Sequence, residues 1–147
     1  ILLDFTNSGR ELLARHGIKI NTPKGKGGLV HQFYQNLMAR WFAKNFPQGK
    51  ATIEDMSSGK AVDVSFVGEG KRIAVEILVN GVDKEISNVD ADLWSYDEIW
   101  LVADNKALDR LKKKVGEIFN HAEMGKIQFH QIGKFFSEMS EEGKVEQ

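Results

Sequence analysis

The chain contains no cysteine, only two prolines and no long hydrophobic run. Without cysteine, disulfide bonds and thiolate metal sites are excluded, and the composition suits a reducing compartment, so we expect a cytoplasmic protein. No apolar stretch approaches the roughly 18 residues of a membrane helix, and we therefore expect no membrane association. An excess of positive charge is also lacking, because 20 Lys and Arg face 21 Asp and Glu. This balance excludes a uniformly basic nucleic-acid-binding surface but leaves room for a local basic patch.

A length of 147 residues predicts one compact domain with a sizeable core. Because the chain begins at Ile1 rather than Met, we expect a piece of a longer polypeptide. Residues 1–28 are predicted to form a leading helix, with a capping box at Ser8 and Glu11, followed by a glycine-rich linker. The main domain is then expected over residues 29–136, and a polar, acidic tail over residues 137–147.

Hydrophobic periodicity predicts an α/β domain with a central mixed sheet and helices on both faces. Alternating residues indicate strands that are exposed on one face, whereas continuous apolar runs indicate strands that are buried on both. The expected order is α-β-β-β-α-β-α-β, with helices at 29–46, 84–93 and 108 to about 121, and strands at 51–56, 62–66, 73–79, 99–103 and 127–132.

Two acidic residues, Asp63 and Glu76, fall within strands that otherwise have a buried pattern. A buried carboxylate without a partner is costly, so each requires a cation, a metal ion or backbone donors. If the two strands pair as a hairpin, Asp63 lies beside Glu76, and the two carboxylates could bind Mg²⁺ or Mn²⁺ weakly. In the alternative interpretation, Asp63 only ends a hairpin and Glu76 pairs with Arg72 or Lys60.

The segment SGKAVDVSF, a glycine-containing turn and RIAVEI together resemble the PD-(D/E)xK nuclease superfamily, which has the restriction-endonuclease-like fold. This resemblance, over about residues 6–105, implies that Asp63 and Glu76 hold a catalytic metal ion and that the preceding helix supplies a further polar residue. More narrowly, KGGLVHQFYQ and EIWLV resemble nuclease-like C-terminal domains of DNA-translocating ATPases and mobile-element proteins. Those relatives often carry an upstream winged helix, and TNSGRELLARHGI looks like the end of one.

The chain departs from the superfamily pattern at Leu78, where the motif Glu-x-Lys has a lysine. Leucine can neither bind a phosphate nor orient a water molecule, so the hydrolytic site is incomplete as written. The candidate replacements are Lys84, on the next predicted helix, and Lys60, before the second strand. The departure puts cleavage activity in doubt.

Two further pairs of residues could contact a substrate. His31 and Gln35 are four residues apart on the first long helix and share a face, which the resemblance directs toward Asp63 and Glu76. Alternatively, this pair only caps the helix and contacts solvent. Lys24 and Lys26 precede the N-terminus of that helix and could bind a nucleic-acid phosphate, although a flexible linker is the alternative.

Our leading hypothesis is a DNA-directed nuclease-like domain that hydrolyses phosphodiesters with Mg²⁺ or Mn²⁺ at Asp63 and Glu76, with Gln35 and Lys84 assisting. The rival hypothesis is a catalytically degenerate module that binds DNA or protein within a larger ATPase or regulator. Leu78 favours the rival, whereas the two acidic positions favour the enzyme. A third alternative is an unrelated α/β domain with an accidental resemblance.

Overall fold

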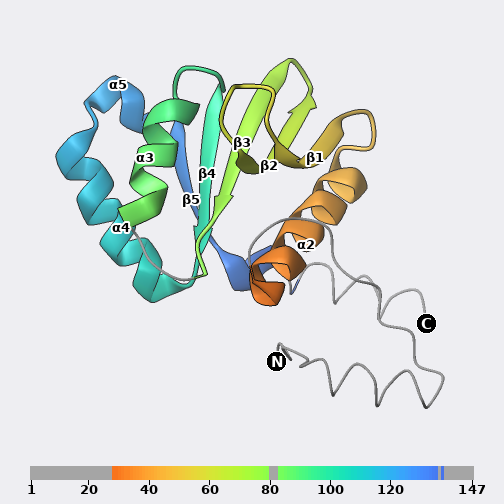
Figure 1. Cartoon of the computed structure of the whole chain (residues 1–147), viewed down its shortest axis with the longest axis horizontal. Coiled ribbons are helices and arrows are strands. Elements are labelled where there is room, and N and C mark those ends of the chain that lie inside the picture. The colour runs from red at the N-terminus through yellow and green to blue at the C-terminus, as the bar shows by residue number, and fades with distance from the viewer. Residues whose placement is uncertain (1–27, 80–82, 136, 138–147) are drawn as a thin grey trace, which may run out of the picture.

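The computed structural model describes residues 28–79, 83–135 and 137. For residues 83–87 it describes the backbone but not the side chains. They form an α/β domain around a five-stranded sheet with the order β1-β2-β3-β4-β5 (Figure 1). The first three strands pair antiparallel, and β3, β4 and β5 pair parallel, so the sheet is mixed. The elements are α2 (Leu29–Asn45), β1 (Lys50–Asp55), β2 (Val62–Gly68), β3 (Lys71–Ile77), α3 (Asp83–Asp92), β4 (Glu98–Ala103), α4 (Asn105–Ile118), α5 (His121–Met124) and β5 (Ile127–Gln131).

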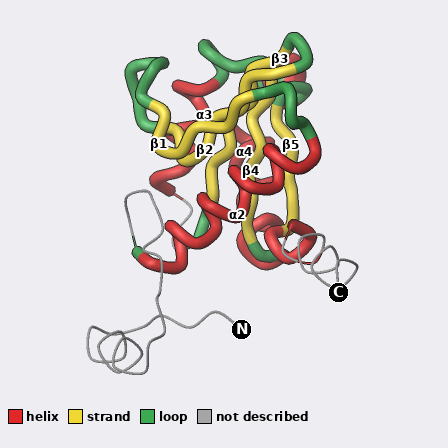
Figure 2. The backbone as a smooth tube through the Cα atoms, turned by 90° about the vertical axis from the view of Figure 1, so that its right-hand side faces the viewer, coloured by secondary structure: helices red, strands yellow, loops and turns green. Residues whose placement is uncertain are grey.

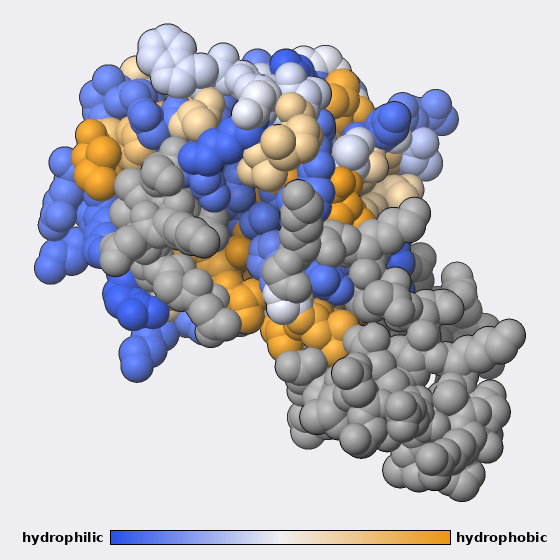
Figure 3. Space-filling view, viewed as in Figure 1, coloured by the Kyte–Doolittle hydropathy of each residue, from blue (hydrophilic) through white to orange (hydrophobic). Residues whose placement is uncertain are grey.

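The sequence therefore predicted the α/β class, the mixed sheet and the order of the main elements correctly. The predicted leading helix and winged-helix fragment, the linker with Lys24 and Lys26, and most of the polar tail lie outside the described residues. Within those residues, no helix is both long and apolar enough to cross a bilayer. The view in Figure 3 shows a largely hydrophilic surface on the described part, with hydrophobic groups in separate patches.

Each face of the sheet has its own helices and its own hydrophobic core. Figure 2 shows α2 in front of the sheet and α4 behind it. On the α2 side, the apolar stripe of the helix, including Trp41 and Phe42, packs on β2, β3 and β4. On the other side, α3 and α4 cover β3, β4 and β5 with residues such as Val89 and Leu111. Trp41 and Trp100 are buried, and the strands that carry the acidic residues are held between two packed layers.

One helix boundary was predicted wrongly. The periodic pattern predicted a single helix to about His121, whereas α4 ends at Ile118 and a separate turn, α5, begins at His121. The interruption is caused by a capping box: the Asn120 side chain accepts from the Glu123 N–H, and the Glu123 carboxylate accepts from the Asn120 N–H. These bonds start a new helical turn and fix the connection to β5.

Candidate metal centre

Three side chains from three different elements converge between α2 and the β1–β2 hairpin. His31 on α2, Glu54 on β1 and Asp63 on β2 each offer a ligand atom, and these atoms all lie within 4.8 Å of one another. The closest recorded contact joins His31 Nε2 to an Asp63 carboxylate oxygen at 3.2 Å, with the two side chains 20% and 16% exposed. The group is thus partly shielded but remains accessible to a small ion.

The β1–β2 pairing explains why Glu54 meets Asp63. Ile53 pairs with Val64 and Asp55 with Val62, so the register places Glu54 opposite Asp63. The backbone of Glu54 adopts a left-handed conformation with φ of 54°, which is uncommon for a residue other than glycine. Strained backbone of this kind persists only where its surroundings hold it, and it concentrates at functional sites.

A break in the side-chain alternation of β2 turns Asp63 toward α2. In a regular strand, Val62 and Val64 would face the same side of the sheet. Here Val62 packs in the core beneath α3 and α4, whereas Val64 packs in the core beneath α2. Val62, Val64 and Phe66 therefore do not share one face of the strand, and the irregularity falls at Asp63, opposite the strained Glu54.

Asp63 also closes the end of the β2–β3 pairing. The last recorded pair of these strands is Val64 with Val75, so one further step in register would place Asp63 opposite Glu76. Instead of a continued ladder, an Asp63 carboxylate oxygen accepts a hydrogen bond from the Ile77 N–H at 2.7 Å. This bond fixes the carboxylate that also contacts His31.

Gln35 connects the three elements from within the protein. Its side chain is fully buried, and its Nε2 donates to a Glu54 carboxylate oxygen at 2.7 Å and to the Asp63 carbonyl at 3.1 Å. The spacing predicted that His31 and Gln35 share a helix face, and the resemblance directed that face toward Asp63 and Glu76. The structure brings both residues together with Asp63. Gln35 therefore positions Glu54 and the backbone at Asp63.

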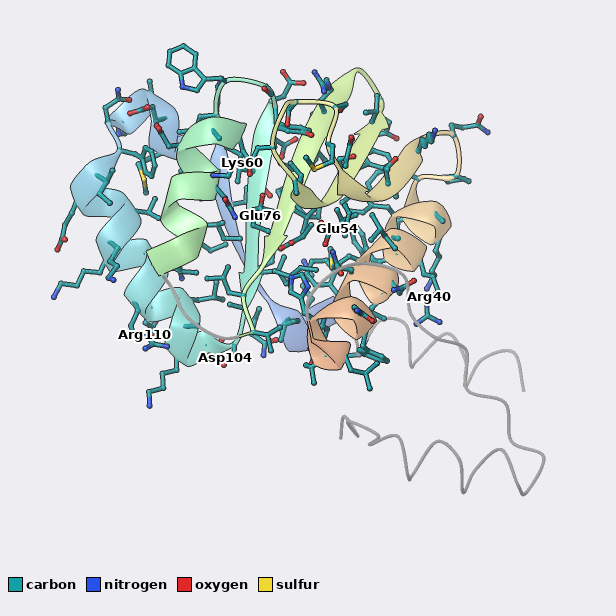
Figure 4. All side chains as sticks on the ribbon, in the orientation of Figure 1. Arg40, Glu54, Lys60, Glu76, Asp104 and Arg110 are labelled. Atoms are coloured by element: carbon teal, nitrogen blue, oxygen red, sulfur yellow. The ribbon has the colours of Figure 1, made fainter. Side chains whose placement is uncertain are left out.

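Glu76, the second predicted metal ligand, makes a polar contact on the other side of the sheet. It is 1% exposed, and its side chain hydrogen-bonds that of Asp92, on α3. Figure 4 shows Glu54 near α2 and Glu76 on the side of α3. Burial raises the pKa of Asp92 to about 6, although the bond with Glu76 and the charge of Lys60 oppose this rise. Two buried carboxyl groups in contact are most stable when they share a proton.

Among the described residues, the group of three ligand atoms therefore contains Asp63 but not Glu76. Asp63 belongs to that group, whereas a metal-ligand role for Glu76 stays a prediction. The alternative pairing of Glu76 with Arg72 or Lys60 also stays a prediction: the charge of Lys60 acts on Asp92, and the Arg72 guanidinium lies 5.0 Å from the centre of the Tyr96 ring.

Lys60 and Lys84 are the candidate replacements for the lysine that Leu78 displaces. Lys60 contributes a positive charge near Asp92, which contacts Glu76. Lys84 belongs to α3, but its side chain lies outside the described residues. Leu78 is 5% exposed and packs in the core beneath α3 and α4. The structure thus gives Leu78 a packing role on that face.

Sequence reasoning did not single out Glu54. The residue lies in a short strand with no motif around it, and its relation to Asp63 depends on pairing across the β1–β2 turn. The available signal was the turn at Ser57 to Gly59: a hairpin closed there places residue 54 opposite residue 63. Recognising that register would have added a third ligand.

The donor set fits a divalent cation. Two carboxylates and one imidazole suit Mn²⁺ and related transition metals, whereas Mg²⁺ is bound mainly by oxygen. The buried Oε1 of Gln35 has no hydrogen-bond partner within the described residues, although the same side chain contacts two members of the group. Water bound to a cation would supply the donor that this acceptor lacks.

Comparison of the chain with protein-family models, with curated proteins and with solved structures found no match in any of the three cases.

Proposed function

We propose that this chain is a DNA-directed, nuclease-like domain of the restriction-endonuclease-like fold, which hydrolyses phosphodiesters with a divalent cation at His31, Glu54 and Asp63. The observation that carries the proposal is the convergence of these three ligand groups around a buried, incompletely bonded Gln35. The DNA substrate and a parent polypeptide such as a DNA-processing ATPase come from the sequence resemblance.

The arrangement of the strands supports this proposal. The order of one helix, an antiparallel β1–β2–β3 unit, a helix and a parallel β4 is the one that the resemblance implies. In that arrangement, one acid is expected on the second strand and another on the third, as Asp63 and Glu76 are. Such a likeness concerns fold, and the chemistry rests on the side chains.

The residues of the chain have separable tasks in the proposed reaction. A divalent cation, when bound, would polarise a water molecule and offset negative charge on the phosphodiester. The Ile77 N–H and the Gln35 amide hold the acidic ligands in place before any substrate arrives. Partial exposure of His31 and Asp63 leaves the group open to a phosphate of the DNA backbone.

A catalytically degenerate DNA-binding module is the second candidate function, and Leu78 favours it. This residue occupies the lysine position of the Glu-x-Lys motif and is buried among apolar side chains. The missing amine would have stabilised negative charge in the transition state, and loss of one such group typically lowers the rate by about 10²–10³. Cleavage is therefore expected to be slow.

A plasmid-nicking assay with Mn²⁺, run beside a gel-shift assay, tests the proposal. We expect slow nicking by the wild-type chain, loss of nicking in Asp63→Asn and Glu54→Gln, and no change in Glu117→Gln, which alters an exposed acid on α4. DNA binding without nicking by the wild type would favour the binding module. If the wild type neither binds nor nicks DNA, both candidate functions are contradicted.

A further inference from the structure

A hollow of about 300 Å³ lies beside the turn that follows α3, where α5 approaches it. Its most unusual feature is Trp94, which is 88% exposed, in contrast to the buried Trp41 and Trp100. A tryptophan so exposed gives up most of the stabilisation that burial of its ring would provide. The hollow is lined by Leu93, Trp94, Asn120, Ala122, Glu123 and Lys126.

The frame around the hollow is fixed by backbone hydrogen bonds. The N–H groups of Ser95 and Tyr96 both donate to the Asp92 carbonyl at 3.0 Å, directly after Trp94. On the opposite wall, the capping box fixes Asn120 and Glu123, and the Ile99 N–H donates to the Lys126 carbonyl. Both walls are therefore preorganised, which lowers the entropic cost of binding a ligand.

Three polar groups in the lining have bonding capacity to spare. Within the described part of the chain, no hydrogen bond or ion pair is recorded for the Lys126 ammonium or for the side-chain NH₂ of Asn120. Glu123 uses one carboxylate oxygen, Oε1, to accept from the Asn120 N–H at 2.9 Å, which leaves Oε2. The hollow thus offers an aromatic face, a cation, an amide donor and a carboxylate acceptor.

We infer that this hollow binds an amine-bearing nucleobase, stacked on the Trp94 indole, with its attached phosphate paired to the Lys126 ammonium. Stacking of a base on an exposed aromatic ring is a general mode of binding unpaired nucleotides. The Glu123 carboxylate can accept from the exocyclic amine of adenine or cytosine, and the Asn120 NH₂ can donate to a ring nitrogen or a carbonyl. Uracil and thymine lack that amine and are expected to bind more weakly.

The composition of the lining favours a nucleotide over a protein partner. A protein docking site centres on an aromatic anchor in an apolar, desolvated patch. Here half of the lining residues are polar or charged, and they line an open hollow. The inference does not rest on the proposed nuclease function, because no ligand of the metal centre lines the hollow.

Fluorescence and ligand-observed NMR test this inference on the full chain. The probes are AMP, UMP, and single-stranded oligo-dA and oligo-dT of equal length. Because Trp41 and Trp100 are buried, saturable quenching by AMP would report chiefly on Trp94. Saturation-transfer NMR on the base protons gives a second readout that does not need the tryptophan. We expect Trp94→Ala to weaken AMP binding about 10-fold or more, and Trp94→Phe to retain most of it.

Lys126→Gln is expected to weaken AMP binding, and Lys113→Gln, an exposed lysine on α4, to leave it unchanged. If oligo-dA binds more tightly than AMP, the ligand is a nucleic-acid strand. If oligo-dA binds equally or more weakly than AMP, the ligand is a free nucleotide. Both results support the site. The inference is overturned if AMP and oligo-dA fail to bind, if uracil and thymine bind equally well, or if a folded Trp94→Ala variant keeps the wild-type affinity.

Discussion

One carboxylate oxygen of Asp63 accepts a hydrogen bond from the Ile77 N–H at 2.7 Å and lies 3.2 Å from His31 Nε2. The same atom therefore joins β2 to β3, just beyond their last recorded pair, and contacts α2. A side chain with two such contacts contributes to folding as well as to the candidate site. Changes at Asp63 must accordingly be tested for stability before activity is interpreted.

We expect Asp63→Ala to lower the free energy of unfolding by about 1–3 kcal/mol, because the Ile77 N–H loses a charged acceptor and His31 loses its contact with the Asp63 carboxylate. Asp63→Asn retains a carbonyl oxygen as an acceptor and should cost less. Urea denaturation of the two variants and the wild type measures the difference. Equal stability of Asp63→Ala and the wild type would show that the bond to Ile77 contributes little.

The raised pKa of Asp92 predicts that the stability of the fold depends on pH in an unusual way. Burial raises its pKa in the folded protein from 3.8 to about 6, so the folded state binds the proton more tightly than the unfolded state. The free energy of unfolding contributed by this group therefore falls as pH rises from about 4 to about 6, and the loss persists above that range. As pH rises between these limits, the free energy of unfolding of Asp92→Asn should increase by about 2–3 kcal/mol relative to that of the wild type.

Denaturation series at several pH values, on the wild type, Asp92→Asn and Asp90→Asn, check this expectation. Asp90 is exposed on the same helix and serves as the control. The Asp90→Asn curve should run parallel to that of the wild type. If the Asp92→Asn curve is parallel as well, the Asp92 carboxyl is not held in its raised-pKa environment.

Leu78→Lys should be strongly destabilising, because the side chain packs in the core with Val89 and Tyr96. Burial of an ammonium group there is expected to cost several kcal/mol. The nearly isosteric Leu78→Met should cost less than about 1.5 kcal/mol. Thermal and urea unfolding measure both changes. A Leu78→Lys variant as stable as the wild type would mean that the ammonium finds a partner such as Glu76, as the Glu-x-Lys motif requires.

The sequence was most informative where the pattern is local. The apolar stripe of α2 and the continuous runs around Val75 and Leu101 follow directly from periodicity, and the structure places them as expected. That His31 and Gln35 share one face of α2 was also predictable, since they are one helical turn apart. These features need only the geometry of one element.

The remaining features depend on contacts between elements. Glu54 joins the site through strand register and a left-handed backbone, and the break in alternation at Asp63 cannot be seen in a period-two pattern. Glu76 proved to hydrogen-bond Asp92, a helix residue that has no motif of its own. Pairing of this kind is decided by packing across the sheet, which no local pattern encodes.

Calorimetric titration with Mn²⁺ tests the central claim, that His31, Glu54 and Asp63 form the metal centre. The variants are Glu54→Gln, Asp63→Asn and Glu76→Gln, with Glu117→Gln as the control. We expect weak, saturable binding to the wild type, a loss of about 10-fold or more in affinity for Glu54→Gln and Asp63→Asn, and near wild-type binding for Glu76→Gln and Glu117→Gln. Unchanged binding by Glu54→Gln, together with loss in Glu76→Gln, would contradict the account and favour an Asp63–Glu76 site.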